Sequence, residues 1–373
     1  MDEFATVLAA VRPKQRTDQY NILAALYCLG AAKTPVTTRV VQDFLELHLG
    51  KTQVPVNLNA RFRTYSTFVR VADKGPPLRW TLSPPGLEKI RTLSGLPLPT
   101  DHLLDDYLTD VGVVCALEYP EFAAVIEASG GSAAWQPVGS ARFPHVYRAC
   151  EIKTDRGKPL KVVGTTSTSM GLTASSIVTT QLIMQFRPRL VVMIGIAAGT
   201  RQGNKEFGDV LVADPSIDYN SGKVVFAGGI RDFLPDPYPI GLNARLRSVL
   251  QKYRGVNDVF REIRSGWTGR LPTLGNRVHI GPLGAADQVI DDESRIIEIQ
   301  RNWRKLIGVE METYGVYRAC HESPEPKPRF VSMKSVCDFA AEKSDSWQDY
   351  AAYVAAQFAF RFIKIEWESL WNT

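Results

Sequence analysis

The chain has 373 residues, of which 45% are hydrophobic, and it carries a formal net charge of +5. This length can bury one or two hydrophobic cores, so two domains are expected. No apolar run reaches membrane-spanning length and the N-terminal residues lack the order of a signal peptide, so we expect a cytoplasmic protein with no membrane partner.

The five cysteines are scattered without CxxC or Cys/His spacing, which argues against a disulfide framework and against a zinc site. Neither a metal nor a cofactor is therefore expected. The basic excess lies in the first 100 residues, which hold 13 Lys and Arg against 7 Asp and Glu, whereas the rest holds 31 against 32. This asymmetry is compatible with an acidic partner for the first part and also with an ordinary solvated face.

Residues 1–100 have the pattern of a small helical domain with a hairpin. Tyr20, Leu23 and Tyr27 repeat at helical spacing, and two further helical patterns follow. Two short strands and a last helix complete the set. The expected helices are residues 17–29, a segment after Thr37, residues 58–65 and residues 84–93, and the expected strands are residues 68–71 and 79–82.

This order of elements resembles a winged helix. A winged helix can contact nucleic acid, with Arg61, Arg63, Arg70 and Lys74 as candidate contacts, or it can dock a protein partner. We favour a protein-interaction or regulatory domain, because the basic residues are few and unclustered. DNA binding stays as the alternative.

A proline-rich linker at residues 96–100 leads into the second domain, residues 101–373. Its first expected strand, residues 111–117, is followed by an acidic loop with Glu118 and Glu121 and by a helix. The next strand, residues 160–165, leads into a hydroxyl-rich turn that ends in Met170 and Gly171. Such a turn can offer backbone N–H groups and hydroxyls to a ribose or a phosphate.

Residues 191–196 form a continuous apolar run, which predicts a central parallel strand. The small residues that follow it, Ala197 to Gly199, would let a ligand approach the backbone closely. A basic insertion at residues 228–276 precedes a strand at residues 278–283 and a turn with Gln288 and Val289.

The most informative stretch is residues 306–340. Glu310 and Glu312 stand at the entrance of a helical pattern, and a short apolar strand runs out at Asp338. Carboxylates from two elements are thereby expected at one place, where an α/β fold binds a ligand across its strand ends. The alternative is that these residues only favour a helix N-terminus or cap the next helix.

The segments GVEMETYGVYRAC and VSMKSVCDFA resemble the paired signature of the nucleoside phosphorylase and nucleosidase superfamily, in particular its methylthioadenosine/S-adenosylhomocysteine nucleosidase-like members. GVVCALEYPE resembles the first strand and acidic loop of that family, and LVVMIGIAAG its central strand and glycine-rich turn. The ordered set covers residues 112–340. The resemblance implies an α/β, three-layer mixed-sheet domain behind the winged-helix-like α+β domain.

The resemblance also implies roles for residues. Asp338 would be the acid that protonates the purine, Glu312 would hold the ribose hydroxyls and stabilise positive charge on the sugar, and Glu121, with Glu118 as second choice, would orient the nucleophile. The expected substrate-binding residues are Met170, Gly171, Gly195, Ile196, Ala197, Gln288, Val289, Glu310, Met311 and Cys337.

The function that this implies is hydrolysis of the N-glycosidic bond of a purine nucleoside or nucleotide. Water is favoured over phosphate, because the first loop is acidic and the hydroxyl-rich turn has no arginine. A phosphate-dependent nucleoside phosphorylase and a nucleoside-sensing DNA-binding regulator are the alternatives. The extra N-terminal domain suggests a regulated, nucleotide-depleting effector of antiviral defence, and a homo-oligomer is expected from the family.

Overall fold

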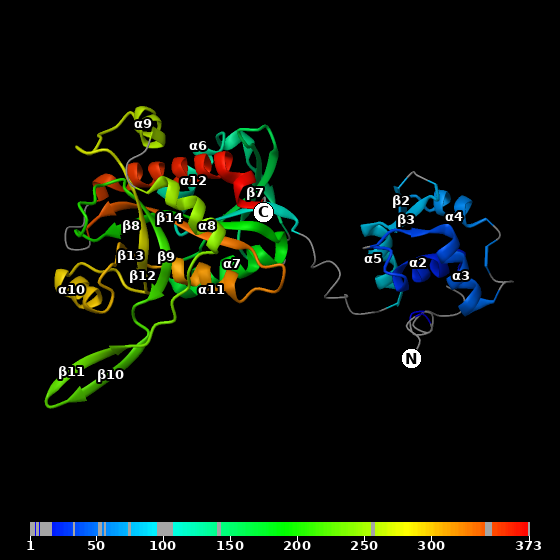
Figure 1. Cartoon of the computed structure of the whole chain (residues 1–373), viewed down its shortest axis with the longest axis horizontal. Helices are drawn as coiled ribbons and strands as arrows, with labels where there is room; N and C mark the ends of the chain where they lie inside the picture. The colour runs from blue at the N-terminus through cyan, green and yellow to red at the C-terminus, as the bar shows by residue number, and fades with distance from the viewer. Residues whose placement is uncertain are drawn as a thin grey trace. The chain divides into compact units, whose positions relative to one another are not determined.

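The computed structural model describes residues 4, 7, 17–32, 34–50, 54–55, 57–73, 76–94, 107–139, 143–254, 258–339 and 345–371. The chain divides into two compact units, Met1–Asp105 and Asp106–Thr373, whose elements are labelled in Figure 1. The expected linker at residues 96–100 and the expected contact Lys74 lie outside the described residues. No helix in the described ranges is long and apolar enough to cross a membrane.

The N-terminal unit contains four described helices and a three-stranded antiparallel sheet in the order β1-β3-β2. The two-residue strand β1 is too short for a sequence pattern to indicate, and the other elements lie where the sequence predicts them. The assignment as a winged helix stays a prediction. The elements are α2 (Asp18–Cys28), β1 (Val36–Thr37), α3 (Thr38–Leu49), α4 (Leu58–Thr64), β2 (Val69–Asp73), β3 (Arg79–Leu82) and α5 (Pro84–Ser94).

Side-chain caps define where the helices of this unit begin. The side chains of Thr17, Thr37 and Asn57 each accept a hydrogen bond from a backbone N–H in the first turn of α2, α3 and α4. Phe62 of α4 packs on Trp80 of β3, with ring centroids 4.8 Å apart. Both rings are buried, so helix and sheet share one core.

The C-terminal unit is built on a nine-stranded mixed sheet in the order β13-β12-β9-β14-β8-β4-β7-β6-β5. The neighbours β14, β8, β4 and β7 run parallel, so their carboxyl ends meet at one edge. The strands are β4 (Thr109–Cys115), β5 (Gln136–Val138), β6 (Tyr147–Lys153), β7 (Pro159–Thr166), β8 (Pro188–Gly199), β9 (Val210–Asp218), β12 (Val278–Ala285), β13 (Gly308–Glu310) and β14 (Arg329–Asp338).

Helices cover both faces of this sheet. The long helix α12 lies on one face, and α7 and α11 lie on the other (Figure 1). Strand β4 shows the alternation that this requires: Val113 belongs to the core beneath α12, whereas Val114 packs with Val178 of α7 and Val316 of α11. The helices are α6 (Ala123–Ala128), α7 (Leu172–Phe186), α8 (Ala244–Leu250), α9 (Asp258–Ser265), α10 (Glu293–Asn302), α11 (Thr313–His321) and α12 (Gln348–Trp371), with a π-helical turn at Glu118–Phe122 and 3-10 turns at Ser132–Ala134, Gln251–Tyr253 and Asp345–Trp347. The expected three-layer mixed-sheet fold is confirmed.

A separate antiparallel hairpin, β10 (Gly222–Ala227) and β11 (Ile230–Pro235), extends away from the sheet (Figure 1). The sequence analysis did not predict it. Gly228 and Gly229 join the strands, both with positive φ, which is the backbone of a tight two-residue hairpin turn. A Gly-Gly pair between two short segments rich in β-branched and aromatic residues was therefore an available signal.

Candidate active site

A cavity of about 370 Å³ opens at the carboxyl ends of the parallel strands. Its residues come from the segments that follow β4, β7 and β12, from the last residues of β8, from the β13–α11 junction, from the second half of β14 and from the start of α12. The lining residues are Ala116, Leu117, Glu121, Met170, Ile196, Ala197, Ala198, Gln288, Val289, Ile290, Val309, Glu310, Met311, Glu312, Lys334, Cys337, Asp338 and Gln348.

Asp338 is the last residue of β14 and is half-buried. Val336 pairs with Ala197 of β8 and Asp338 with Ala198, so the register shifts between them. Irregularities of this kind redirect side chains at the ends of strands. Here two successive residues, Cys337 and Asp338, both line the cavity instead of pointing to opposite faces.

Glu121 is buried and held by the backbone of the segment after β4 and of strand β8. Its Oε2 accepts hydrogen bonds from the N–H groups of Ala116 (2.8 Å) and Leu117 (3.0 Å), and its Oε1 accepts one from Ile196 (2.9 Å). Burial raises the pKa of Glu121, an effect that the Lys334 ammonium partly opposes. A carboxylate with a raised pKa is suited to accept a proton near neutral pH.

Gly195, which lies against the Glu121 carboxylate, is required for this arrangement. A Cβ on Gly195 would lie 2.1 Å from the Glu121 Oε1, so only glycine leaves room for the carboxylate. Glu118, the alternative base, is exposed and forms an ion pair with Arg148 at 2.6 Å. The structure therefore places Glu121, and not Glu118, in the cavity.

Glu312 stands at the N-terminus of α11 and is buried. Its Oε1 accepts a hydrogen bond from the N–H of Gly171 (3.1 Å), and its backbone carbonyl accepts one from the Ser175 hydroxyl (3.0 Å). These contacts join the start of α7 to the start of α11. They hold the Glu312 carboxylate at the wall of the cavity.

Glu310 is the last residue of β13, and its buried side chain caps the N-terminus of α11. Its carboxylate accepts hydrogen bonds from the N–H groups of Glu312 (2.9 Å) and Thr313 (2.9 and 3.0 Å). Burial raises its pKa to about 7, with Lys334 opposing and Glu312 adding to the shift. The helix-capping alternative from the sequence therefore describes Glu310 correctly, although the residue also lines the cavity.

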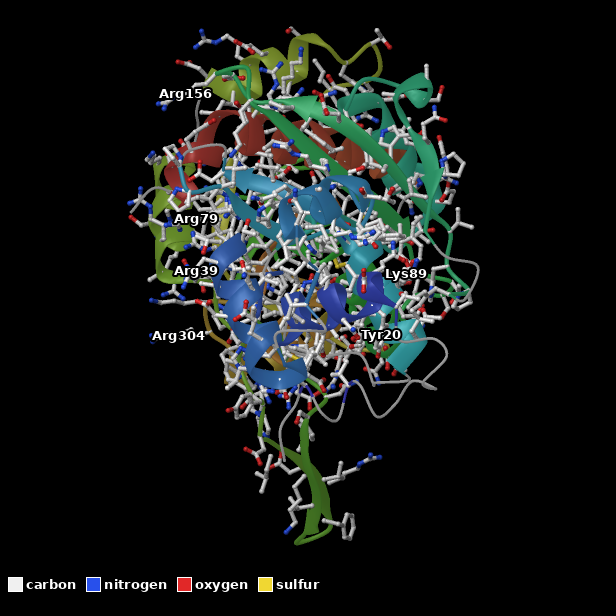
Figure 2. All side chains as sticks on the ribbon, turned by 90° about the vertical axis from the view of Figure 1, so that its right-hand side faces the viewer. Tyr20, Arg39, Arg79, Lys89, Arg156 and Arg304 are labelled. Atoms are coloured by element: carbon white, nitrogen blue, oxygen red, sulfur yellow. The ribbon has the colours of Figure 1, made fainter. Side chains whose placement is uncertain are left out.

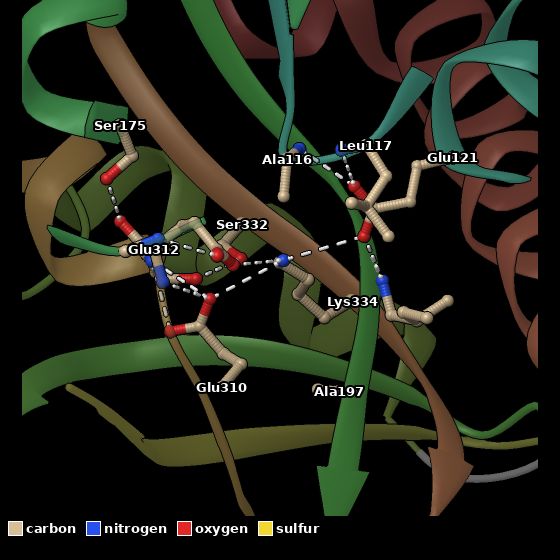
Figure 3. Close-up of polar contacts among 12 residues, drawn as sticks. Ala116, Leu117, Glu121, Ser175, Ala197, Glu310, Glu312, Ser332 and Lys334 are labelled. Atoms are coloured by element: carbon tan, nitrogen blue, oxygen red, sulfur yellow. Dashed lines mark hydrogen bonds and ion pairs between the residues drawn. The ribbon is translucent and has the colours of Figure 1, made fainter. Parts of the chain in front are cut away.

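Lys334 lies between the three glutamates, with Glu121 on one side and Glu310 and Glu312 on the other (Figure 3). Its Nζ is 3.8 Å from Glu121, 3.5 Å from Glu310 and 3.2 Å from Glu312. The side chain is 1% exposed. Burial alone would lower its pKa, but the carboxylates overcome this and hold the pKa above its ordinary value. No role was predicted for Lys334 from the sequence.

The other expected binding residues divide into two groups. Gly171 and Gly195 are not among the cavity-lining residues; they lie against the carboxylates of Glu312 and Glu121. The remaining ones line the cavity with mainly apolar surface: Met170, Ile196, Ala197, Gln288, Val289, Met311 and Cys337. In the part of the chain that the structure describes, no group of three or more His, Cys, Asp or Glu side chains is arranged to hold a metal ion.

The raised pKa of Glu310 predicts a pH dependence of stability. Because its pKa is about 7 in the folded chain and 4.5 without burial, the folded state binds the proton more tightly between these pH values. This group therefore stabilises the fold below about pH 4.5, and that stabilisation, roughly 3 kcal/mol in total, is lost as the pH rises through 7. The melting temperature of Glu310→Gln should fall less between pH 5 and pH 8 than that of the wild type. The exposed Glu293→Gln is the control, and parallel curves for all three proteins would contradict the assignment.

Fold and cavity together define an α/β domain with a cavity of small-molecule size at its strand ends. The chain belongs to the phosphorylase superfamily, whose family model matches residues 110–364. It is 32% identical over 251 residues to the Sinorhizobium fredii protein y4jS, and 23% identical over 295 residues to the Escherichia coli ATP nucleosidase Cap17. These matches cover 67% and 76% of this chain, but only 60% and 57% of the two relatives.

Solved structures show the same fold. The chain resembles the Helicobacter pylori 5'-methylthioadenosine/S-adenosyl homocysteine nucleosidase with a TM-score of 0.53 and 17% identity, over 69% of this chain and 99% of the other. It resembles the futalosine hydrolase of the same organism with a TM-score of 0.52 and 17% identity, over 69% and 97%. Both comparisons cover a length that corresponds to the C-terminal unit, which has 268 residues, rather than the whole chain.

Proposed function

We propose that the protein hydrolyses the N-glycosidic bond of a purine nucleoside or nucleotide and releases the free base. The main support for this proposal is that Asp338, Glu121 and Glu312 line the same cavity at the strand ends. The cavity volume falls in the range that small-molecule sites occupy. The relatives named as nucleosidases point to the same class of reaction.

Each carboxylate has a part in this reaction. The bond between C1′ of the ribose and N9 of the purine breaks, and the electron pair leaves with the base. Asp338, protonated beforehand, gives its proton to N7 so that the base leaves as a neutral molecule. The ribose becomes positively charged, and Glu312 stabilises that charge and holds the sugar hydroxyls.

Glu121 directs the water that completes the reaction. The oxygen of water bonds to C1′, and the proton it loses passes to the Glu121 carboxylate. Three backbone N–H groups fix this carboxylate: Oε2 accepts two of these hydrogen bonds, whereas Oε1 accepts one and retains a lone pair for water. Its raised pKa makes it a stronger base than an exposed glutamate.

The charge of the cavity favours water over phosphate as the nucleophile. Four acidic side chains line the cavity: Glu121, Glu310, Glu312 and Asp338. Among the described lining residues Lys334 is the one cation, and it already pairs with three of these carboxylates. A phosphate dianion would meet net negative charge there, whereas neutral water would not.

The test is chromatography of the protein incubated with adenosine, inosine, guanosine, methylthioadenosine, AMP, ATP and dATP, each with and without phosphate. Release of base without phosphate supports the hydrolase, and release from ATP would give this chain the substrate that the name of Cap17 states for that protein. Release only with phosphate would identify a phosphorylase. No release from any substrate would favour the nucleoside-sensing regulator.

We propose a protein partner, in preference to DNA, for residues 1–100. Several basic side chains of this unit are engaged within it: Arg39 pairs with Asp43 at 3.1 Å and Arg61 with Asp18 at 3.2 Å. Figure 2 shows Arg39 and Arg79 on one side of the unit and Lys89 towards the other, so these charges form no single stripe. Salt-dependent DNA binding by the full chain would contradict this choice.

A homo-oligomer is proposed for the C-terminal unit, with a second copy covering the hairpin β10–β11. Val224, Phe226 and Leu234 are exposed on this hairpin, Phe226 to 77%. A two-stranded hairpin is marginally stable alone in water, and clustered exposed apolar side chains mark interaction sites. Light scattering of the purified protein measures the mass; a monomer at micromolar concentration would contradict the proposal.

A further inference from the structure

The Cys337 thiol lies between two hydrogen-bond acceptors. Its Sγ is 3.3 Å from the Asp338 Oδ2 and 3.6 Å from the carbonyl oxygen of Ala197. The side chain is 4% exposed and lines the cavity beside Asp338. A thiol carries a single proton, so it can donate to one of these acceptors at a time.

The charge on Asp338 decides which acceptor the thiol prefers. While Asp338 is ionised, its carboxylate is the stronger acceptor and also the nearer one. Once Asp338 takes up a proton, it becomes a donor itself, and the neutral carbonyl of Ala197 remains for the thiol. The acceptor of the thiol's hydrogen bond therefore changes with the protonation state of Asp338.

The surroundings keep the thiol protonated so that it can act in this way. Burial raises the pKa of Cys337 well above its ordinary value, and the adjacent Asp338 carboxylate raises it further. Glu121 acts in the same direction and Lys334 opposes it. Arg201, whose guanidinium lies 4.8 Å from the Phe339 ring centroid, is a further charge near this end of the strand.

We propose, on the basis of the hydrolysis proposed above, that Cys337 is a positioning residue that orients the Asp338 carboxyl and sets the pH at which this acid regains its proton. A thiol is a weak donor. It steers the ionised carboxylate without stabilising it as strongly as a hydroxyl would. Asp338 consequently recovers its proton at a higher pH than it would beside a serine, and remains an acid for the next turnover.

The first test is the pH profile of kcat for the wild type, Cys337→Ser and Cys337→Ala. The serine hydroxyl stabilises the ionised Asp338 more strongly, so the alkaline limb of the profile should move to lower pH by roughly half a unit or more. In the alanine variant, which has no donor, the limb should move to higher pH. A side chain that only fills space would change kcat without moving the limb, so coincident limbs in all three proteins would overturn the proposal.

The second test needs no turnover. The alkylation rate of Cys337 by iodoacetamide is followed by mass spectrometry of its peptide between pH 7 and pH 10, in the wild type and in Asp338→Asn. Loss of the neighbouring negative charge should raise the thiolate fraction and speed alkylation roughly threefold to tenfold at pH 8.5. Cys28, in the other unit, is the internal reference. Equal alkylation rates of Cys337 in the wild type and in Asp338→Asn would overturn the coupling. If Asp338→Asn is labelled faster but the wild type releases no base from any substrate, only the proposed function is overturned.

Discussion

Asp338→Asn is expected to lower the rate of base release by about 10² to 10⁴-fold while the domain stays folded. Asparagine has the size of aspartate, and position 338 is a half-buried strand end, so packing changes little. The amide, however, has no acidic proton to give to a departing purine. Steady-state kinetics with the best substrate of the panel measures the loss, and thermal unfolding checks the fold.

A substrate whose base leaves without being protonated tests whether Asp338 acts as the acid. The purine of 7-methylguanosine already carries a positive charge and leaves without protonation at N7. If the wild type cleaves it, Asp338→Asn should cleave it at a rate within about tenfold of the wild type. The exposed Asp236→Asn is the matched control and should behave as the wild type on all substrates. Equal losses on adenosine and 7-methylguanosine would show that Asp338 positions the substrate and does not act as its acid.

Local patterns in the sequence were sufficient to find strands β4, β7, β8, β12 and β14 and the four carboxylates that line the cavity. An apolar run that stops at an acidic residue indicates a strand whose end carries that acid, and β14 ends at Asp338 in this way. Glu121 and Glu312 follow from the same kind of pattern together with the family signature. The roles assigned to these residues stay predictions, because position in a cavity is not a measurement of chemistry.

Lys334 could not be found in the same way. It occupies a strand position within an apolar run, where a lysine is compatible with an exposed edge as well as with a buried partner. Its partner Glu121 is 213 positions away in the chain, and only the pairing of β14 with β8, and of β8 with β4, brings the two together. The helical and strand periodicities contain no information on such a contact.

The role of the glycines was likewise hidden from the sequence. Gly195 was expected to contact the substrate, but the group that lies against it is the Glu121 carboxylate. The same holds for Gly171, whose N–H binds Glu312. Gly195 makes room for a catalytic candidate from another element and Gly171 donates a hydrogen bond to one, which only the assembled fold shows.

Lys334→Met is expected to destabilise the C-terminal domain by about 3–5 kcal/mol at neutral pH and to abolish base release. Methionine fills a similar volume, so the loss reports charge and not a cavity. Without the ammonium, Glu121, Glu310 and Glu312 face each other in a buried site. Denaturant unfolding of the variant, beside the exposed Lys161→Met as control, measures the difference.

The pH dependence of this loss distinguishes electrostatics from packing. In Lys334→Met the pKa values of Glu121 and Glu310 should rise further, since the Lys334 ammonium that lowers them is gone. Folded carboxylates with raised pKa values favour the folded state only while they are protonated, so the deficit should be smallest near pH 5 and should grow as the pH rises towards 8. A deficit that is the same at both pH values would mean that Lys334 stabilises the domain through the packing of its methylene chain. Its ammonium would then not be what stabilises the ionised glutamates.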